Sequence, residues 1–126
     1  MSRSVFACLV ATALLTTAAN AAQTSLQIEI SADQDFQRHI ITYDCADEAP
    51  MAVTYINAAP NFLALVPIPE ETEALVFASV MSASGARYAS GKWVWWSKGA
   101  DAELYDTTLG DDAEPVLTCS ELVNTP

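Results

Sequence analysis

The chain has 126 residues and carries 16 acidic against 5 basic side chains, which gives a formal net charge of −11 at pH 7. This length allows one domain with one modest core. The negative charge disfavours nucleic acid or an anionic lipid surface as a partner and favours encounter with a cationic one, although solubility alone is its simpler use.

Residues 1–21 have the pattern of a secretory signal peptide. Arg3 gives a positive start, residues 5–17 form a short apolar run, and an A-x-A cleavage site ends at Ala21. The run is too short to span a bilayer permanently. Cys8 lies inside this run, whereas a lipid-anchored protein keeps its cysteine directly after it. We therefore expect a periplasmic or secreted protein, soluble after cleavage near Ala21 and without a stable membrane anchor.

Cleavage would leave 105 residues, a formal net charge of −12 and two cysteines, Cys45 and Cys119. An even pair of cysteines in an oxidising compartment is most simply one disulfide. It would close a loop of about 75 residues, worth roughly 4 kcal/mol in the chain-entropy model. Because the mature chain has no C-x-x-C pattern, redox catalysis and a zinc ribbon are both disfavoured.

After the leader, apolar and polar residues alternate as they do in β-strands. Residues 22–41 are predicted to be an N-terminal arm or a peripheral strand, in which Leu26, Ile28 and Ile30 alternate with polar residues. Eight further strand candidates are separated by turn signals: residues 38–45, 51–57, 61–68, 73–81, 86–90, 92–97, 102–107 and 115–122. Eight or nine short strands at near-regular spacing predict a small all-β fold, an antiparallel barrel or sandwich.

One segment differs from the acidic remainder of the chain. No carboxylate occurs between Glu73 and Asp101, yet this gap holds three of the five cations and every tryptophan, namely Arg87, Lys92, Lys98, Trp93, Trp95 and Trp96. Consecutive strand residues point to opposite faces, so at most one of Trp95 and Trp96 faces the core. An outward tryptophan either packs at the rim of the fold or stacks on a partner.

The same segment contains a hairpin signal. If Ser90-Gly91 forms a two-residue turn, Ser84 faces Ser97, and Lys98 follows directly at the open end of the hairpin. Gly85 and Gly99 flank that end, where free backbone torsions suit protruding loops. A bulge would shift this register.

The sequence gives little support for a catalytic or metal site. His39 is the single histidine, and nothing in the sequence places it beside Ser84. Paired carboxylates such as Asp111-Asp112 lie in polar turns, where solvated charge is the usual explanation. The acidic clusters lack the spacing of a calcium loop and have no His or Cys companions. We expect no enzyme activity, no cofactor and no metal.

Two motifs carry a family resemblance. "SASGARY" (82–88) and "WVWWSKGADAEL" (93–104), after "YDC" (43–45) and before a C-terminal cysteine, resemble the MliC/PliC family of bacterial inhibitors of C-type lysozyme over about residues 42–121. The resemblance implies an eight-stranded antiparallel barrel in residues 42–126, tied by a disulfide between the "YxC" strand and the C-terminus. Family members occur in lipid-anchored and soluble periplasmic forms, and the leader places this chain with the soluble form.

The resemblance also implies a function and a site. Ser84, in the S-G-x-x-Y motif, and Lys98, in the W-x-K-G motif, would enter the lysozyme cleft and contact its catalytic carboxylates. Neighbouring motif residues complete the expected lysozyme-binding set: Gly85, Arg87, Tyr88 and Gly99. The alternative is a secreted barrel that binds an apolar or sugar ligand through its tryptophan face, although a barrel of about 80 residues leaves little interior room. The oligomeric state stays open.

Overall fold

The computed structural model describes residues 26–31, 33 and 35–123, so the predicted signal peptide lies outside the described residues. Eight strands and one short 3₁₀ helix make up the regular structure of this part of the chain. They are β1 (Gln37–Cys45), β2 (Met51–Ala58), β3 (Asn61–Val66), β4 (Leu75–Val80), β5 (Ala86–Ser90), β6 (Trp93–Lys98), β7 (Asp101–Asp106), η1 (Thr107–Leu109) and β8 (Leu117–Glu121).

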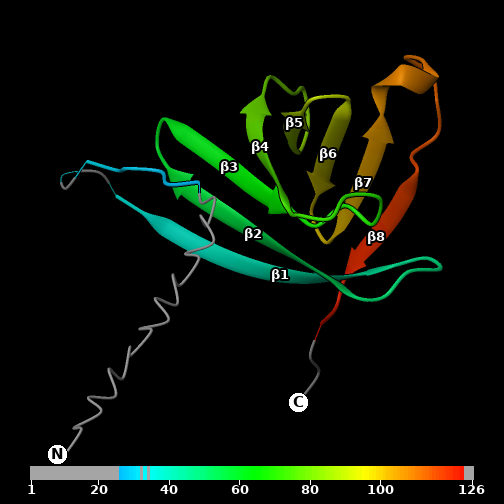
Figure 1. Ribbon diagram of the computed structural model, residues 1–126, viewed down its shortest axis with the longest axis horizontal. Coiled ribbons are helices and arrows are strands. Elements are labelled where there is room, and N and C mark those ends of the chain that lie inside the picture. Colours follow the sequence, from blue (N-terminus) through cyan, green and yellow to red (C-terminus); the bar gives the residue numbers. More distant parts are fainter. Residues whose placement is uncertain (1–25, 32, 34, 124–126) are drawn as a thin grey trace, which may run out of the picture.

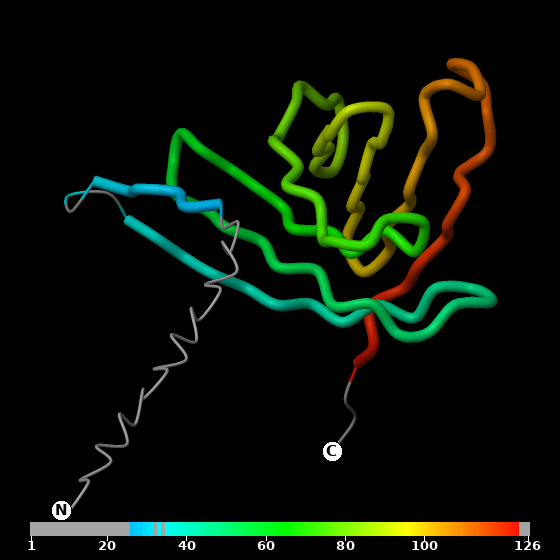
Figure 2. The backbone as a smooth tube through the Cα atoms, viewed as in Figure 1, coloured from blue at the N-terminus to red at the C-terminus, as the bar shows by residue number. Residues whose placement is uncertain are grey.

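The strands form a closed antiparallel barrel in which each strand pairs with its neighbours in the chain (Figure 1). β8 returns to pair with β1, where Cys45 lies opposite Cys119. Figure 2 shows the backbone running back and forth along the barrel, with longer connections between β3 and β4 and between β7 and β8. Of the two predicted architectures, the barrel is therefore confirmed. The seam between β8 and β1 is short, because β8 pairs only with the last three residues of β1, Tyr43–Cys45.

The alternating residues at the start of the described chain do not form a ninth strand. Residues 26–31 have no strand structure. Leu26 and Ile28 instead line an apolar groove of about 410 Å³ on the outside of the barrel, together with Ile56 of β2 and Leu63 of β3. β1 begins at Gln37, so the first half of this strand comes from the segment 22–41.

The inward face of each strand fills the barrel with large apolar side chains. The largest fully buried ones include Trp95, Tyr43, Phe77, Leu104, Val53 and Val66. The polar atoms among them are satisfied, since Trp95 Nε1 donates a hydrogen bond of 2.8 Å to Tyr55 Oη, which lies 2.8 Å from Tyr43 Oη. Burial raises the pKa of Tyr43 far above its usual value, so this phenol stays protonated. An interior packed in this way does not favour a ligand inside the barrel.

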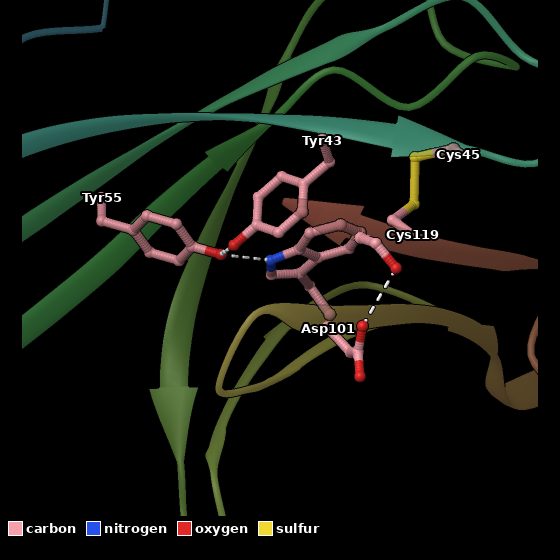
Figure 3. The surroundings of a disulfide bond; sticks show 7 residues. Tyr43, Cys45, Tyr55, Asp101 and Cys119 are labelled. Atoms are coloured by element: carbon pink, nitrogen blue, oxygen red, sulfur yellow. Dashed lines mark hydrogen bonds between the residues drawn. A yellow bond between two sulfur atoms is a disulfide. The ribbon is translucent and has the colours of Figure 1, made fainter. Parts of the chain in front are cut away.

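A disulfide joins the first and last strands. Cys45 and Cys119 are bonded, as predicted, and their Cα atoms lie 4.1 Å apart (Figure 3). Both residues are 1% exposed and pack against the aromatic core. The bond closes a loop of 74 residues in sequence separation. It therefore fastens the barrel at the seam where β8 meets β1.

The hairpin register predicted from Ser90-Gly91 is wrong by two residues. The turn is formed by Gly91 and Lys92, and Ser90 pairs with Trp93. Gly91 has a φ of +55°, the left-handed conformation that a type II′ turn requires at its first central position. Strand β5 consequently ends one residue later than the predicted turn allows, and Ala86 pairs with Ser97 at the open end.

Candidate functional site

Most of the predicted site residues lie at one outer edge of the barrel, where the β4–β5 loop meets the β6–β7 turn. Ser84 and Gly85 belong to the loop, Lys98 ends β6 and Gly99 begins the turn, and all four are exposed. Trp96 lies two residues before Lys98 and therefore on the same outward face of β6. We call these five residues the tip.

The indole of Trp96 connects the two halves of the tip. Its Nε1 donates a hydrogen bond of 2.9 Å to the main-chain oxygen of Ser84, and Lys98 Nζ lies 3.8 Å from a ring centroid of the indole. Arg87, the cross-strand partner of Trp96 on β5, places its Cζ 4.9 Å from the ring. Both cations thus make cation–π contacts with one side chain. Trp96 holds the loop and the lysine next to each other.

Gly85 allows the β4–β5 loop to lie close to β6. Its φ is +64°, and a Cβ added there would lie 2.4 Å from the main-chain oxygen of Ser97 and 2.7 Å from Lys98 Cγ. Real Cβ atoms do not approach other atoms at such distances, so any other residue would push the loop away from β6. A glycine at this position is therefore what brings Ser84 beside Lys98.

The charge of Lys98 has no ionic partner within the described part of the chain. Lys98 is the register partner of Asp101 across the β6–β7 turn, but Asp101 Oδ1 accepts a hydrogen bond of 3.0 Å from Ser120 Oγ, the dashed line at Asp101 in Figure 3. The next acid on β7, Glu103, accepts a hydrogen bond from the hydroxyl of Tyr105, which raises the pKa of Tyr105 to about 12. These two carboxylates of β7 accept hydrogen bonds from hydroxyl groups, and neither forms an ion pair with Lys98.

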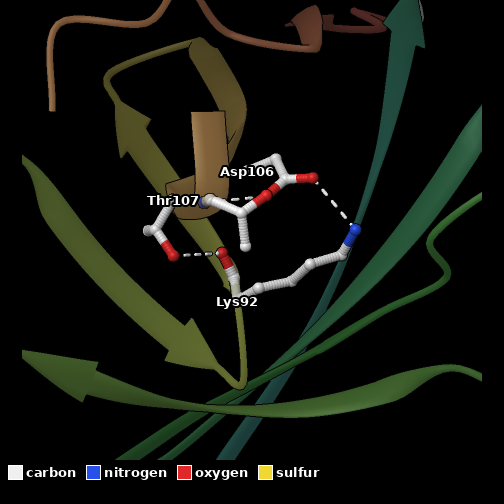
Figure 4. Close-up of polar contacts among 4 residues, drawn as sticks. Lys92, Asp106 and Thr107 are labelled. Atoms are coloured by element: carbon white, nitrogen blue, oxygen red, sulfur yellow. Dashed lines mark hydrogen bonds and ion pairs between the residues drawn. The ribbon is translucent and has the colours of Figure 1, made fainter. Parts of the chain in front are cut away.

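Lys92 is the opposite case. It lies in the β5–β6 turn at the other end of the hairpin and forms an ion pair of 2.9 Å with Asp106 (Figure 4). Its main-chain oxygen also accepts a hydrogen bond of 2.8 Å from Thr107 Oγ1. Hydrogen bonds from Thr108 and Lys92 hold the pKa of the Asp106 carboxyl below its usual value. This cation is already neutralised by its own protein.

Two predicted site residues are placed differently from the tip. Tyr88 points into the barrel, is 6% exposed and packs against Tyr55 with ring centroids 5.7 Å apart. Arg87 is half-buried on the outer face, and its Nε has no hydrogen-bond partner among the described residues. The structure therefore brings together Ser84, Gly85, Lys98 and Gly99. Arg87 contacts the ring of Trp96 next to them, and Tyr88 lies in the core.

Sequence reasoning did not single out Trp96. It established that Trp95 and Trp96 face opposite sides, which is correct, since Trp95 is fully buried. The hairpin register does not decide which of the two faces outward, because a shift of two residues leaves every side chain on the same face. Alternation alone leaves both assignments open, since both side chains are large and apolar. The hydrogen bond of Asp101 to Ser120 was also missed, because the residues are 19 apart in sequence and meet only through the pairing of β7 with β8.

The described residues hold no group of three or more His, Cys, Asp and Glu side chains that could bind a metal ion. His39 is exposed on β1 and its Nε2 lies 3.4 Å from Gln37 Oε1. Within the described ranges no helix is long and apolar enough to cross a membrane. The arrangement of the tip is that of a contact surface, with a hydroxyl, a free ammonium group and exposed backbone.

The fold and the tip define a class of protein, a small disulfide-closed β-barrel with an acidic body that presents an exposed lysine without an ion-pair partner among the described residues. A family model described as membrane-bound lysozyme-inhibitor of c-type lysozyme, MliC, matches residues 43–112, and the chain belongs to this family. Its members are inhibitors and not enzymes.

Curated relatives and a solved structure agree with this assignment. The membrane-bound lysozyme inhibitor of C-type lysozyme from Pseudomonas aeruginosa is 35% identical over 94 residues, which cover 75% of this chain and 73% of the relative. The protein of the same name from Cupriavidus necator is 32% identical over 118 residues, 92% of this chain and 93% of the relative. The crystal structure of Pseudomonas aeruginosa MliC in complex with hen egg white lysozyme matches with a TM-score of 0.65 at 34% identity, over 82% of this chain and 100% of that chain.

Proposed function

We propose that this protein inhibits C-type lysozyme by inserting the tip into the active-site cleft of the enzyme, where Lys98 and Ser84 contact the catalytic carboxylates. The observation that carries the proposal is the unpaired ammonium group of Lys98 beside the exposed Ser84. Members of the family are named as inhibitors of C-type lysozyme, and one is crystallised with hen egg white lysozyme, which supports the choice of partner.

The chemistry of the two surfaces is complementary. Lysozyme hydrolyses its substrate with two carboxyl groups that flank the scissile bond. Lysine is a compact charge with three donors, suited to lie between two carboxylates, and the serine hydroxyl donates to one of them. An inhibitor that binds both catalytic carboxylates keeps the substrate out of the cleft and makes these groups unavailable for the reaction.

The charge distribution of the whole protein supports the same partner. C-type lysozymes are basic proteins with an acidic cleft, so an inhibitor must match two fields of opposite sign. The acidic body attracts the basic enzyme over a long range, while the segment between Glu73 and Asp101 brings no carboxylate to compete for Lys98. Gly99 has a φ of +60°, the conformation that favours glycine, and a Cβ built there would meet no atom within 4 Å, so the turn is open to a partner.

The alternative, binding of a sugar or an apolar ligand through a tryptophan face, has less support. Trp93 and Trp95 are buried, and the outward Trp96 is in contact with Lys98 and Arg87. Among the described residues the outward aromatic surface at this face is the pair Trp96 and Tyr105, with ring centroids 6.4 Å apart, beside a pocket that is lined largely by polar and charged residues.

We further propose that the chain is exported to the periplasm or beyond, with cleavage near Ala21 and no lipid anchor. The support is the leader pattern of residues 1–21 and the position of Cys8 within its apolar run. Mass analysis of the exported protein tests this: the expected product starts at Ala22 and carries no lipid.

Titration of the purified mature protein into a lysozyme cell-wall lysis assay tests the proposed function. Removing one partner of a desolvated charge pair costs about 2–5 kcal/mol, so Lys98→Ala should lose roughly 30-fold or more in affinity. Ser84→Ala should lose less, because a neutral donor is removed. Lys92→Ala is the matched control, since this lysine is bound to Asp106 at the other end of the hairpin. If the parent does not inhibit, or if Lys98→Ala inhibits as well as Lys92→Ala, the proposal is wrong.

A further inference from the structure

Trp96 has contacts that the inhibitory roles of Ser84 and Lys98 do not account for. Its ring touches Lys98 and Arg87, and its Nε1 binds the main chain of Ser84. We infer that Trp96 is a positioning residue: it fixes the ammonium group of Lys98 and the backbone of Ser84 relative to each other before any partner binds. The consequence for inhibition rests on the proposed function, whereas the positioning itself is a property of the free protein.

The need for such a residue follows from the nature of lysine. An exposed lysine on a flexible four-carbon stem loses much conformational freedom when its head is fixed in one place. A contact that already restrains the head in the free protein lowers this cost on binding. Lys98 has no carboxylate to restrain it within the described chain, so the face of Trp96, 3.8 Å away, is what holds the ammonium group. The indole restrains the ammonium group but leaves its charge in place, whereas an ion pair would neutralise that charge.

The loop is held by the other edge of the same ring. Residues 82–85 carry no regular hydrogen-bonded structure. The oxygen of Ser84 accepts hydrogen bonds from Trp96 Nε1 and from the hydroxyl of Ser82. The indole bond is the one that reaches across to β6, the strand that carries Lys98. Tryptophan is the aromatic residue that combines a strong cation-binding face with a ring N–H donor.

Trp96 can be changed without emptying the core. Its side chain is on the outer face and does not belong to the buried cluster, which is built around Trp95, Phe77 and the interior tyrosines. Trp96→Leu therefore removes both contacts of the tip and keeps the barrel. Trp96→Phe keeps a ring under Lys98 and removes only the N–H donor, so it separates the two contacts.

Nuclear magnetic resonance of the free protein tests the positioning directly. In the parent, the ε-methylene protons of Lys98 should be shifted upfield by the ring current of Trp96, and Trp96→Leu should return them to the values of an exposed lysine. Trp96→Phe should keep part of the shift. Lys92, whose Nζ lies 4.3 Å from the ring of Trp93, is an internal control and should not change in either variant. An unshifted Lys98 in the parent would overturn the inference, whatever the protein does to lysozyme.

Inhibition of lysozyme tests the consequence. Losing an exposed cation–π contact and one hydrogen bond should weaken inhibition by Trp96→Leu about tenfold. Trp96→Phe should recover part of this loss, and combining Trp96→Leu with Lys98→Ala should cost less than the product of the two separate losses, since Trp96 acts in part through Lys98. Full inhibition by Trp96→Leu, with its Lys98 shift lost, would refute the positioning role but leave the proposed function intact. Full inhibition by Lys98→Ala would instead refute the proposed function.

Discussion

Gly85→Ala tests whether the close approach of the β4–β5 loop to β6 matters. Gly85 has a φ of +64°, which costs about 1–2 kcal/mol for a residue with a Cβ. The new Cβ would also lie 2.4 Å from the main-chain oxygen of Ser97 and 2.7 Å from Lys98 Cγ. The lysine stem can move aside, but the oxygen belongs to a paired strand. Relief of such an overlap by backbone movement typically costs about 1–3 kcal/mol more.

Gly91→Ala is the matched control for this substitution. Gly91 has a similar φ of +55°, but a Cβ there meets no atom within 4 Å. Gly91→Ala should therefore be destabilised only by the cost of a positive φ. The two variants should differ by about 1–3 kcal/mol in the free energy of unfolding measured with urea. Gly85→Ala should also inhibit lysozyme poorly, because Ser84 is pushed away from Lys98, while Gly91→Ala should inhibit normally. Equal stability and equal inhibition of the two variants would refute the reasoning.

Three further predictions concern the rest of the molecule. Replacing Cys45 and Cys119 by serine should lower the free energy of unfolding by roughly 4 kcal/mol, which urea denaturation of the variant against the oxidised parent measures. Raising the salt concentration should slow association with lysozyme far more than it speeds dissociation, and a salt-independent association rate in a stopped-flow experiment would mean that the acidity serves solubility only. Tyr105 should titrate near pH 12, so its contribution to stability is present below pH 10 and is lost as the pH rises through about 12. The difference between the absorbance titration curves of the parent and of Tyr105→Phe measures this pKa, and a midpoint near pH 10 would contradict the prediction.

The strand positions could be predicted because alternation is a local property. The ends of all eight strands fall within two residues of their predicted ranges. The register of the β5–β6 hairpin could not be predicted in the same way. Glycine takes the second central position of a type I′ turn and the first of a type II′ turn, so one glycine is compatible with either Ser90-Gly91 or Gly91-Lys92. The structure has the second.

The sequence predicted which residues of the candidate site lie close together more fully than it predicted how they are arranged. The motifs pointed to Ser84 and Lys98 together, and the structure places them at one tip. The inward position of Tyr88 was implied by alternation, since its neighbour Arg87 faces outward, but the motif alone did not distinguish a binding residue from a core residue. The role of Trp96 depends on the pairing of β5 with β6 and on the path of the β4–β5 loop, and no local pattern contains that information.

A crystal structure of this protein bound to a C-type lysozyme would test the central claim most directly. The measured quantity is the distance from Lys98 Nζ to the two catalytic carboxylates of the enzyme. We predict that the ammonium group lies within about 2.7–3.2 Å of at least one of these carboxylates, with the hydroxyl of Ser84 in contact with the same pair. A complex in which the lysozyme cleft is open and Lys98 faces solvent, or in which the end of the hairpin that carries Lys92 enters the cleft, would contradict it.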